Sequence, residues 1–138
     1  MKKRWVLLVS SILCCAACNK EKRYTRYLQG TWNCAMVRLQ NADGFTFFDH
    51  IPNGNLSFSE TSVQGLVVSD FVTFQGNVVD SLNLNGNYVM HLENNELNWL
   101  QDNDTLKNRI FVITRDDLEL EYYDPLSNCR FRYVFEKQ

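Results

Sequence analysis

The chain has 138 residues, of which 45% are hydrophobic and 13% aromatic. From Tyr27 onward, 7 basic residues stand against 15 acidic ones, a net charge of −8, which argues against a nucleic-acid partner because such a partner requires a basic patch. Residues 27–138, 112 in number, are enough for one domain that buries most of its unfolded surface.

The first segment has the pattern of an export signal. Lys2, Lys3 and Arg4 precede an apolar run over 5–13, which is shorter than the roughly 20 apolar residues that cross a bilayer. Small residues follow, so the pattern predicts a signal peptide over 1–17. The alternative is a buried N-terminal helix or strand, but three basic residues directly before the apolar run favour targeting.

A cysteine follows this segment at the point where polarity begins. The stretch Ala16-Ala17-Cys18 resembles a bacterial lipobox, although Cys15 stands where that motif has Leu. The resemblance implies that Cys18 becomes the mature N-terminus and carries a thioether-linked diacylglycerol, usually with a further acyl chain such as palmitate. We therefore expect a lipid-anchored protein of the cell envelope.

Residues 18–26 are expected to form a lipidated tether between the anchor and the domain. Its basic residues permit two interpretations, a solvated linker or contact with anionic headgroups, each basic residue then gaining roughly 1 kcal/mol. In some Bacteroidota an acidic run at this place marks export to the cell surface, and this run is basic. We expect the outer membrane, on the side facing the periplasm. The tether's basic residues are Lys20, Lys22, Arg23 and Arg26.

The remainder of the chain, 27–138, predicts an all-β domain. Turn residues recur every 8–12 positions between short runs rich in aromatic and β-branched residues, a spacing typical of a sandwich or barrel. The segment 44–50 is read as a further strand or a lid. Strands are expected near 31–40, 54–60, 64–74, 78–84, 87–92, 96–101, 107–114, 117–123 and 128–136.

Alternation along the strands predicts which side chains face the interior. In the last strand Phe131, Tyr133 and Phe135 share one side with Cys129. Near the start of the domain, Trp32, Cys34 and Met36 share one side in the same way. The aromatic sides are expected to face inward, which leaves one solvated face outside.

Residues 28–32, Leu-Gln-Gly-Thr-Trp, resemble the L-x-G-x-W opening of lipocalin-like domains found in Bacteroidota lipoproteins, and the segments 52–58, 88–100 and 111–120 are similar to later hairpins of that family. The resemblance implies an antiparallel up-and-down barrel of about eight strands, with a β-sandwich as the alternative. It also implies that Trp32 plugs the barrel base and that an Arg near the C-terminus, Arg130 or Arg132, packs on it.

If the barrel holds a ligand, four large side chains of inward parity with polar tips are candidates to line the cavity. In a small barrel the same side chains can also simply fill the interior. These candidates are Met36, Trp99, Tyr122 and Tyr133.

Cys34 and Cys129 remain after the expected processing, and the oxidising periplasm permits a disulfide between them. In a closed meander the first and last strands pair antiparallel. Cys34 then lies near Arg132 or Tyr133, a few residues from Cys129, which is beyond disulfide reach unless a strand bulges. The sequence alone does not decide whether Cys34 and Cys129 form a disulfide.

No motif for enzyme chemistry is evident. His50 and His91 are isolated, and there is no H-x-x-x-H, G-x-S-x-G or phosphate-binding glycine loop. We therefore expect no enzyme, no metal and no cofactor. Two functions remain: binding of a small apolar ligand in the barrel, or a protein-interaction module that uses the aromatic segment 45–48 to bind another envelope protein.

Overall fold

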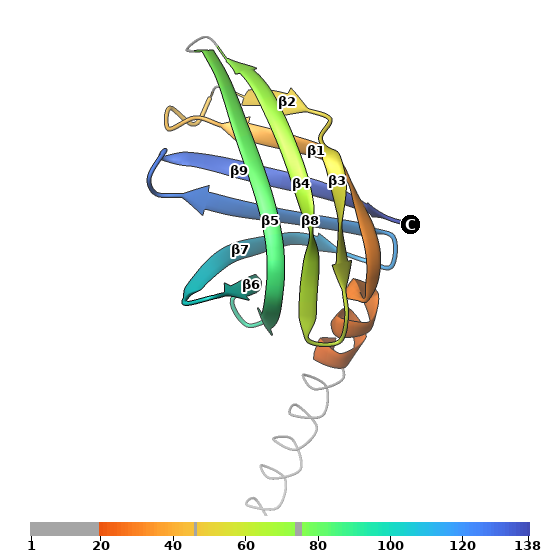
Figure 1. The fold of residues 1–138 in the computed structure, drawn as a ribbon. Helices are drawn as coiled ribbons and strands as arrows, with labels where there is room; N and C mark the ends of the chain where they lie inside the picture. Colours follow the sequence, from red (N-terminus) through yellow and green to blue (C-terminus); the bar gives the residue numbers. More distant parts are fainter. Residues whose placement is uncertain (1–19, 46, 74–75) are drawn as a thin grey trace, which may run out of the picture.

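The computed structural model describes residues 20–138, apart from 46 and 74–75. The expected signal peptide and Cys18 lie outside the described residues. A helix over 20–28 precedes the strands (Figure 1), so the described part of the expected tether is helical. No helix among the described residues is long and apolar enough to cross a membrane. The strands are β1 (Gly30–Gln40), β2 (Phe47–His50), β3 (Asn53–Phe58), β4 (Ser62–Thr73), β5 (Gly76–His91), β6 (Glu96–Gln101), β7 (Asp104–Ile113), β8 (Asp117–Asp124) and β9 (Cys129–Lys137).

These strands form one closed antiparallel meander. Consecutive strands from β3 to β9 pair with each other, and β1 pairs with β9. Both β2 and β3 lie on the other side of β1, opposite its 37–40 and 30–33 segments respectively. They act as one strand interrupted before the buried Pro52, which has no N–H for a ladder bond. With β2 and β3 counted as one strand, the sheet is thus an eight-stranded barrel, as predicted, and the sandwich alternative is wrong.

One predicted hairpin is absent. The break expected between the strands near 78–84 and 87–92 falls at Asn85-Gly86, yet β5 continues through it from Gly76 to His91. Near this point β5 leaves β4 and begins to pair with β6, so that Asn87 lies opposite both Ser62 and Leu100. A Cβ on residue 86 would lie 2.2 Å from the carbonyl oxygen of Leu100. The glycine therefore serves the close approach of a neighbouring strand, not a turn.

The core is a single cluster of buried side chains from the helix and from β1, β3 to β6, β8 and β9, with partly buried side chains of β7 packed against it. Its fully buried members lie between residues 28 and 135, so we expect the barrel to fold without the segment that precedes the helix. The largest of these side chains are Trp32, Trp99, Tyr133, Phe71 and Phe135.

A β-bulge in β1 corrects one predicted site residue. The register with β9 shifts between Cys34 and Met36, so Met36 lies opposite Val134 on the outward side. The extra residue inverts the alternation from that point, and Val37 and Leu39 take the inward positions. The prediction that Met36 faces the interior is wrong for this reason.

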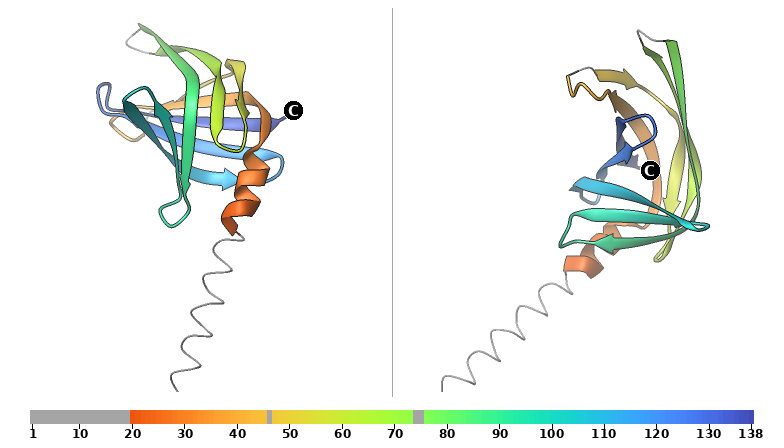
Figure 2. Two further views of the ribbon diagram at one scale, coloured as in Figure 1. Left: turned by 60° about the horizontal axis from the view of Figure 1, so that its bottom comes forward. Right: turned by 90° about the vertical axis from the view of Figure 1, so that its left-hand side faces the viewer.

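The helix packs against one end of the barrel, here called the helix end (Figure 2). Leu28 and Trp32 are both fully buried there, and Trp32 Nε1 donates a hydrogen bond of 2.7 Å to the Leu28 carbonyl. Lys137 Nζ lies 5.0 Å from the centroid of the Trp32 ring and donates a 2.6 Å hydrogen bond to the Tyr27 carbonyl. Two carbonyls of the last helical turn, which have no partner within the helix, are satisfied in this way.

The cation on Trp32 is therefore Lys137, and the expectation of Arg130 or Arg132 is wrong. Both arginines lie on the outward side of β9. The Arg132 guanidinium lies 3.9 Å from the Phe111 ring centroid and 3.2 Å from Glu119 Oε2. Lys137 shares the inward parity of Phe135 and lies opposite Trp32 in the register.

The two cysteines are free thiols in this structure. Cys34 lies opposite Phe135, whereas Cys129 is the first residue of β9. Six residues of strand separate the two positions, about 20 Å at roughly 3.3 Å per residue. That separation exceeds disulfide reach, so Cys34 and Cys129 do not form a disulfide in this structure.

Reactivity of the thiols should differ sharply. Burial raises the pKa of the Cys34 thiol to about 12, so little thiolate is present near pH 8, while Cys129 is only partly buried. In the folded protein we expect maleimide to modify Cys129 and to modify Cys34 only after unfolding. Mass-spectrometric mapping of the adducts checks this, and a Cys34–Cys129 disulfide peptide would contradict it.

Candidate functional site in the barrel interior

Among the polar side chains on the inner face of the barrel, we single out five that lie between apolar neighbours of the same parity. We call them the interior polar set. Each comes from a different strand, β4 to β7 and β9, so the set is distributed around the barrel and not along one edge. The set consists of Ser69, Asp80, Trp99, Asn108 and Tyr133.

The hydrogen bond between Tyr133 and Asp80 joins two strands that are not neighbours in the sheet. The Tyr133 hydroxyl donates to Asp80 Oδ2 at 2.7 Å, so the bond crosses the interior from β9 to β5. Burial raises the pKa of the Asp80 carboxyl, although the bond from Tyr133 opposes this. Burial and the adjacent Asp80 charge raise the pKa of Tyr133 well above its ordinary value. The phenol therefore remains a neutral donor at physiological pH.

Three other atoms of the interior polar set are buried without a hydrogen-bond partner in the protein: Ser69 Oγ, Trp99 Nε1 and Asn108 Oδ1. Ser69 lies directly opposite Asp80 in the ladder. The Asn108 amide nitrogen is occupied by the carbonyls of Leu97 and Leu106, both at 3.1 Å. An unpaired buried polar atom costs about 1–3 kcal/mol of folding free energy. A hydrogen bond from a ligand or a water molecule to one of these atoms would remove that cost.

Aromatic rings also line the interior toward the end of the barrel opposite the helix. Phe71 and Phe131 have ring centroids 6.3 Å apart, and the His50 ring lies 5.8 Å from Phe71. His50 is therefore packed against an apolar ring. A mostly apolar interior with a few convergent polar groups is the usual composition of a small-molecule site.

Three of the four predicted cavity residues, Trp99, Tyr122 and Tyr133, lie on the inner face, and their contact with a ligand stays a prediction. Tyr122 is partly buried, and burial followed by nearby carboxylates, Asp124 first, raises its pKa. The predicted set missed Asp80, although its alternation with Leu82 and Leu84 in β5 places it on the same side. Ser69 and Asn108 were missed in the same way, because polar residues were assigned outward by default.

The Asp80 carboxyl should make stability depend on pH. Its pKa is higher in the folded than in the unfolded protein, so between the two values the native state binds more protons. The free energy of unfolding then falls as pH rises above about 3.9, the ordinary Asp value. We expect Asp80→Asn, which still accepts from Tyr133, to be more stable than wild type at pH 7 and equal to it at pH 3. Urea unfolding at both values measures this, with exposed Asp70→Asn as the control.

The outer face carries a cleft of about 480 Å³ beside the β1–β2 connection, where Arg109, Glu121 and Arg130 contribute to its lining.

In the β1–β2 connection the side chain of Phe45 is 90% exposed, and that of Phe47, the first residue of β2, is 50% exposed. The Arg38 guanidinium lies 5.3 Å from the Phe47 ring centroid. Thr46 lies outside the described residues. In the aromatic segment 45–48 that is expected to bind a protein, Phe45 and Phe47 are thus exposed, whereas Phe48 is partly buried against the core. Among the described residues no group of three or more His, Cys, Asp or Glu is placed to hold a metal ion.

The closed eight-stranded meander, the helix at one end and the buried Trp32 beneath it define a lipocalin-like barrel. No protein-family model and no curated protein sequence matches the chain. Among solved structures, a lipocalin-like protein from Bacteroides uniformis is similar at 17% identity and a TM-score of 0.45, covering 81% of this chain and 99% of that one. Odorant Binding Protein OBP1 is similar at 10% identity and a TM-score of 0.41, covering 82% and 73%. Aphrodisin, a sex pheromone from female hamster, is similar at 12% identity and a TM-score of 0.36, covering 80% and 75%. The fold assignment rests on the strand order and closure of this chain.

Proposed function

We propose that this protein is a lipid-anchored lipocalin-like binder of one small, mostly apolar ligand that carries a polar group. The observation that carries the proposal is the set of three buried polar atoms without partners, placed among aromatic side chains inside the barrel. Such atoms give a ligand its orientation, and the surrounding rings give it affinity. The Tyr133–Asp80 pair supplies a further donor and acceptor inside the barrel, and Ser69 lies opposite Asp80 in the ladder.

A fluorescence titration tests the binding. The probe is N-phenyl-1-naphthylamine, which is apolar with one N–H donor, and dodecan-1-ol serves as competitor. We expect wild type to enhance probe emission and the double variant Ser69→Ala/Tyr133→Phe to bind about 10-fold more weakly, since each lost hydrogen bond contributes about 0.5–1.5 kcal/mol. Ser81→Ala, an exposed outward serine on β5, is the matched control. No enhancement with wild type, or equal loss in the control, would contradict an interior site.

The anchor part of the proposal rests on the sequence around Cys18 and places the protein in the outer membrane, facing the periplasm. Two or three acyl chains would hold it there, because a single chain binds only marginally. Metabolic labelling with an alkyne analogue of palmitate should mark wild type and not Cys18→Ser. Equal labelling of both, or none in wild type, would remove the anchor from the proposal.

A second candidate function is binding of another envelope protein, favoured by the exposed rings of Phe45 and Phe47. It predicts that Phe45→Ser/Phe47→Ser abolishes a specific cross-link to one envelope protein in cells while leaving probe binding intact. Absence of any cross-link that depends on these residues would reject this candidate.

A further inference from the structure

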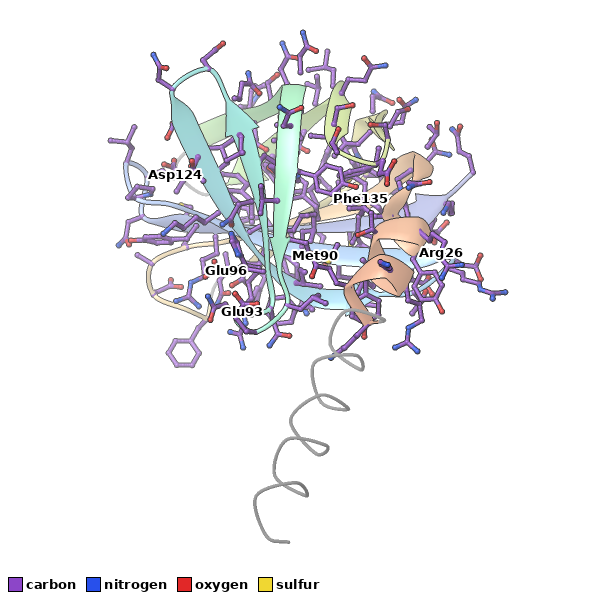
Figure 3. The ribbon with its side chains drawn as sticks, turned by 90° about the horizontal axis from the view of Figure 1, so that it is seen from below. Arg26, Met90, Glu93, Glu96, Asp124 and Phe135 are labelled. Carbon is purple, nitrogen blue, oxygen red and sulfur yellow. The ribbon has the colours of Figure 1, made fainter. Side chains whose placement is uncertain are left out.

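A second pocket lies outside the barrel at the helix end. Its volume is about 570 Å³, and its lining combines the helix, the β7–β8 turn and the end of β9. Figure 3 labels Arg26 on the helix and Asp124 far from it on the other side of the molecule. The lining residues are Arg23, Arg26, Tyr27, Arg115 and Lys137. Four of these five side chains are cationic, and none is a carboxylate.

Two of the cations are held in position by neighbouring groups. Lys137 Nζ is fixed by its hydrogen bond of 2.6 Å to the Tyr27 carbonyl, and the Arg115 guanidinium lies 6.0 Å from the centroid of the Tyr27 ring. The bond from Lys137 also offsets the negative end of the helix dipole at this place. The pocket is thus positive despite lying beside a helix C-terminus.

The four pocket cations form no ion pair with a carboxylate among the described residues. Within the described part of the chain, the ion pairs involve Arg38, His91 and Arg132, and none of the four pocket cations. Gathering like charges is unfavourable unless an anion joins them. This cluster of four cations stands out because residues 27–138 as a whole carry a net charge of −8.

We propose that this pocket binds a phosphate group, either of an anionic phospholipid headgroup or of a soluble phosphate ester. Guanidinium groups bind phosphate oxygens through paired, charge-assisted hydrogen bonds. Arg23 follows Cys18 by five residues, so its Cα lies within about 18 Å of the Cα of that cysteine even for an extended chain. A lipid on Cys18 would bring headgroups within reach. The pocket is distinct from the interior polar set, and its test needs no lipid on Cys18.

The test uses the chain from residue 18 with Cys18→Ser, which contains the whole barrel core described above. Flotation with phosphatidylglycerol vesicles measures binding to the headgroup, with phosphatidylcholine vesicles for comparison. Calorimetric titration with sn-glycerol 3-phosphate measures binding of a free ester. The variant is Arg26→Gln/Arg115→Gln. The control, Arg109→Gln/Arg130→Gln, changes the net charge equally but acts at the outer cleft.

We expect the Arg26/Arg115 variant to bind phosphatidylglycerol vesicles about 30-fold more weakly, because each basic residue near an anionic surface contributes about a factor of five. The control should lose less than twofold. Binding in the vesicle arm alone assigns the phosphate to a lipid, and binding of glycerol phosphate with the same variant dependence assigns it to a soluble ester. Equal loss in both variants, or no binding in either arm, overturns the proposal. Circular dichroism verifies the fold of each variant.

Discussion

Gly65→Ala is expected to unfold the barrel or to destabilise it by at least about 4 kcal/mol, a size reserved for severe defects. The φ angle of residue 65 is +147°, and a Cβ there would lie 2.2 Å from the Asn55 carbonyl oxygen and 2.9 Å from Leu56 Cα. Both atoms belong to the backbone of β3, which pairs with β4 across this point. Relief would require the two strands to separate, because no flexible side chain is involved. Urea unfolding followed by tryptophan fluorescence measures the change.

Gly76→Ala is the matched control for this prediction. Residue 76 has a φ of +118°, yet a Cβ there would meet nothing within 4 Å. It therefore carries the backbone strain without the collision, and we expect a loss of about 1–3 kcal/mol. If Gly65→Ala destabilised the protein no more than Gly76→Ala, the close approach of β3 and β4 would not be the reason for the glycine.

Trp32→Ala is the second large expected effect, about 3–5 kcal/mol, because it removes the fully buried indole at the helix end and leaves a cavity. It also leaves the Leu28 carbonyl without the 2.7 Å bond from Nε1, and Lys137 loses the ring beneath its ammonium group. The helix should then detach from the barrel end. Hydrogen exchange over 20–28, together with chemical unfolding, measures both consequences.

Trp32→Phe separates the two contributions. It keeps most of the apolar volume and removes the N–H donor, so a loss of about 1–3 kcal/mol is expected for the unsatisfied carbonyl. A double-mutant cycle with Lys137→Met should give a coupling of about 0.5–3 kcal/mol, the range for residues in contact. A Trp32→Ala protein as stable as wild type, with the helix still protected, would show that Trp32 does not seal this end.

The barrel class could be predicted because alternation and turn spacing are local properties of the sequence. Position within the barrel could not always be predicted, and the reasons are physical. The extra residue in β1 inverts the side of Met36 without any mark in composition. Gly86 resembles a turn residue, but the approach of β6 to β5 decides its role. Lys137 lies over Trp32 although the two residues are far apart in the sequence. Its hydrogen bond to the Tyr27 carbonyl likewise spans 110 residues.

In the interior site, too, some features follow from the local sequence and others depend on the closed barrel. The inward side of Tyr133 follows from alternation within one strand, whereas its partner Asp80 lies 53 residues earlier in a strand that is not adjacent. Sequence reasoning treats a carboxylate in a strand as solvated, and here the raised pKa of Asp80 reflects the opposite environment. Such pairs become visible only when the barrel is closed.

Closure between β1 and β9 bears on the export that is proposed for this chain. The ladder that joins Gly30–Gln40 to Cys129–Lys137 is the last to become possible when synthesis proceeds from the N-terminus. A polypeptide threaded through a translocation channel therefore cannot complete this cylinder until its final strand has emerged. On the export route proposed above, the barrel would therefore close only after the chain has crossed the membrane.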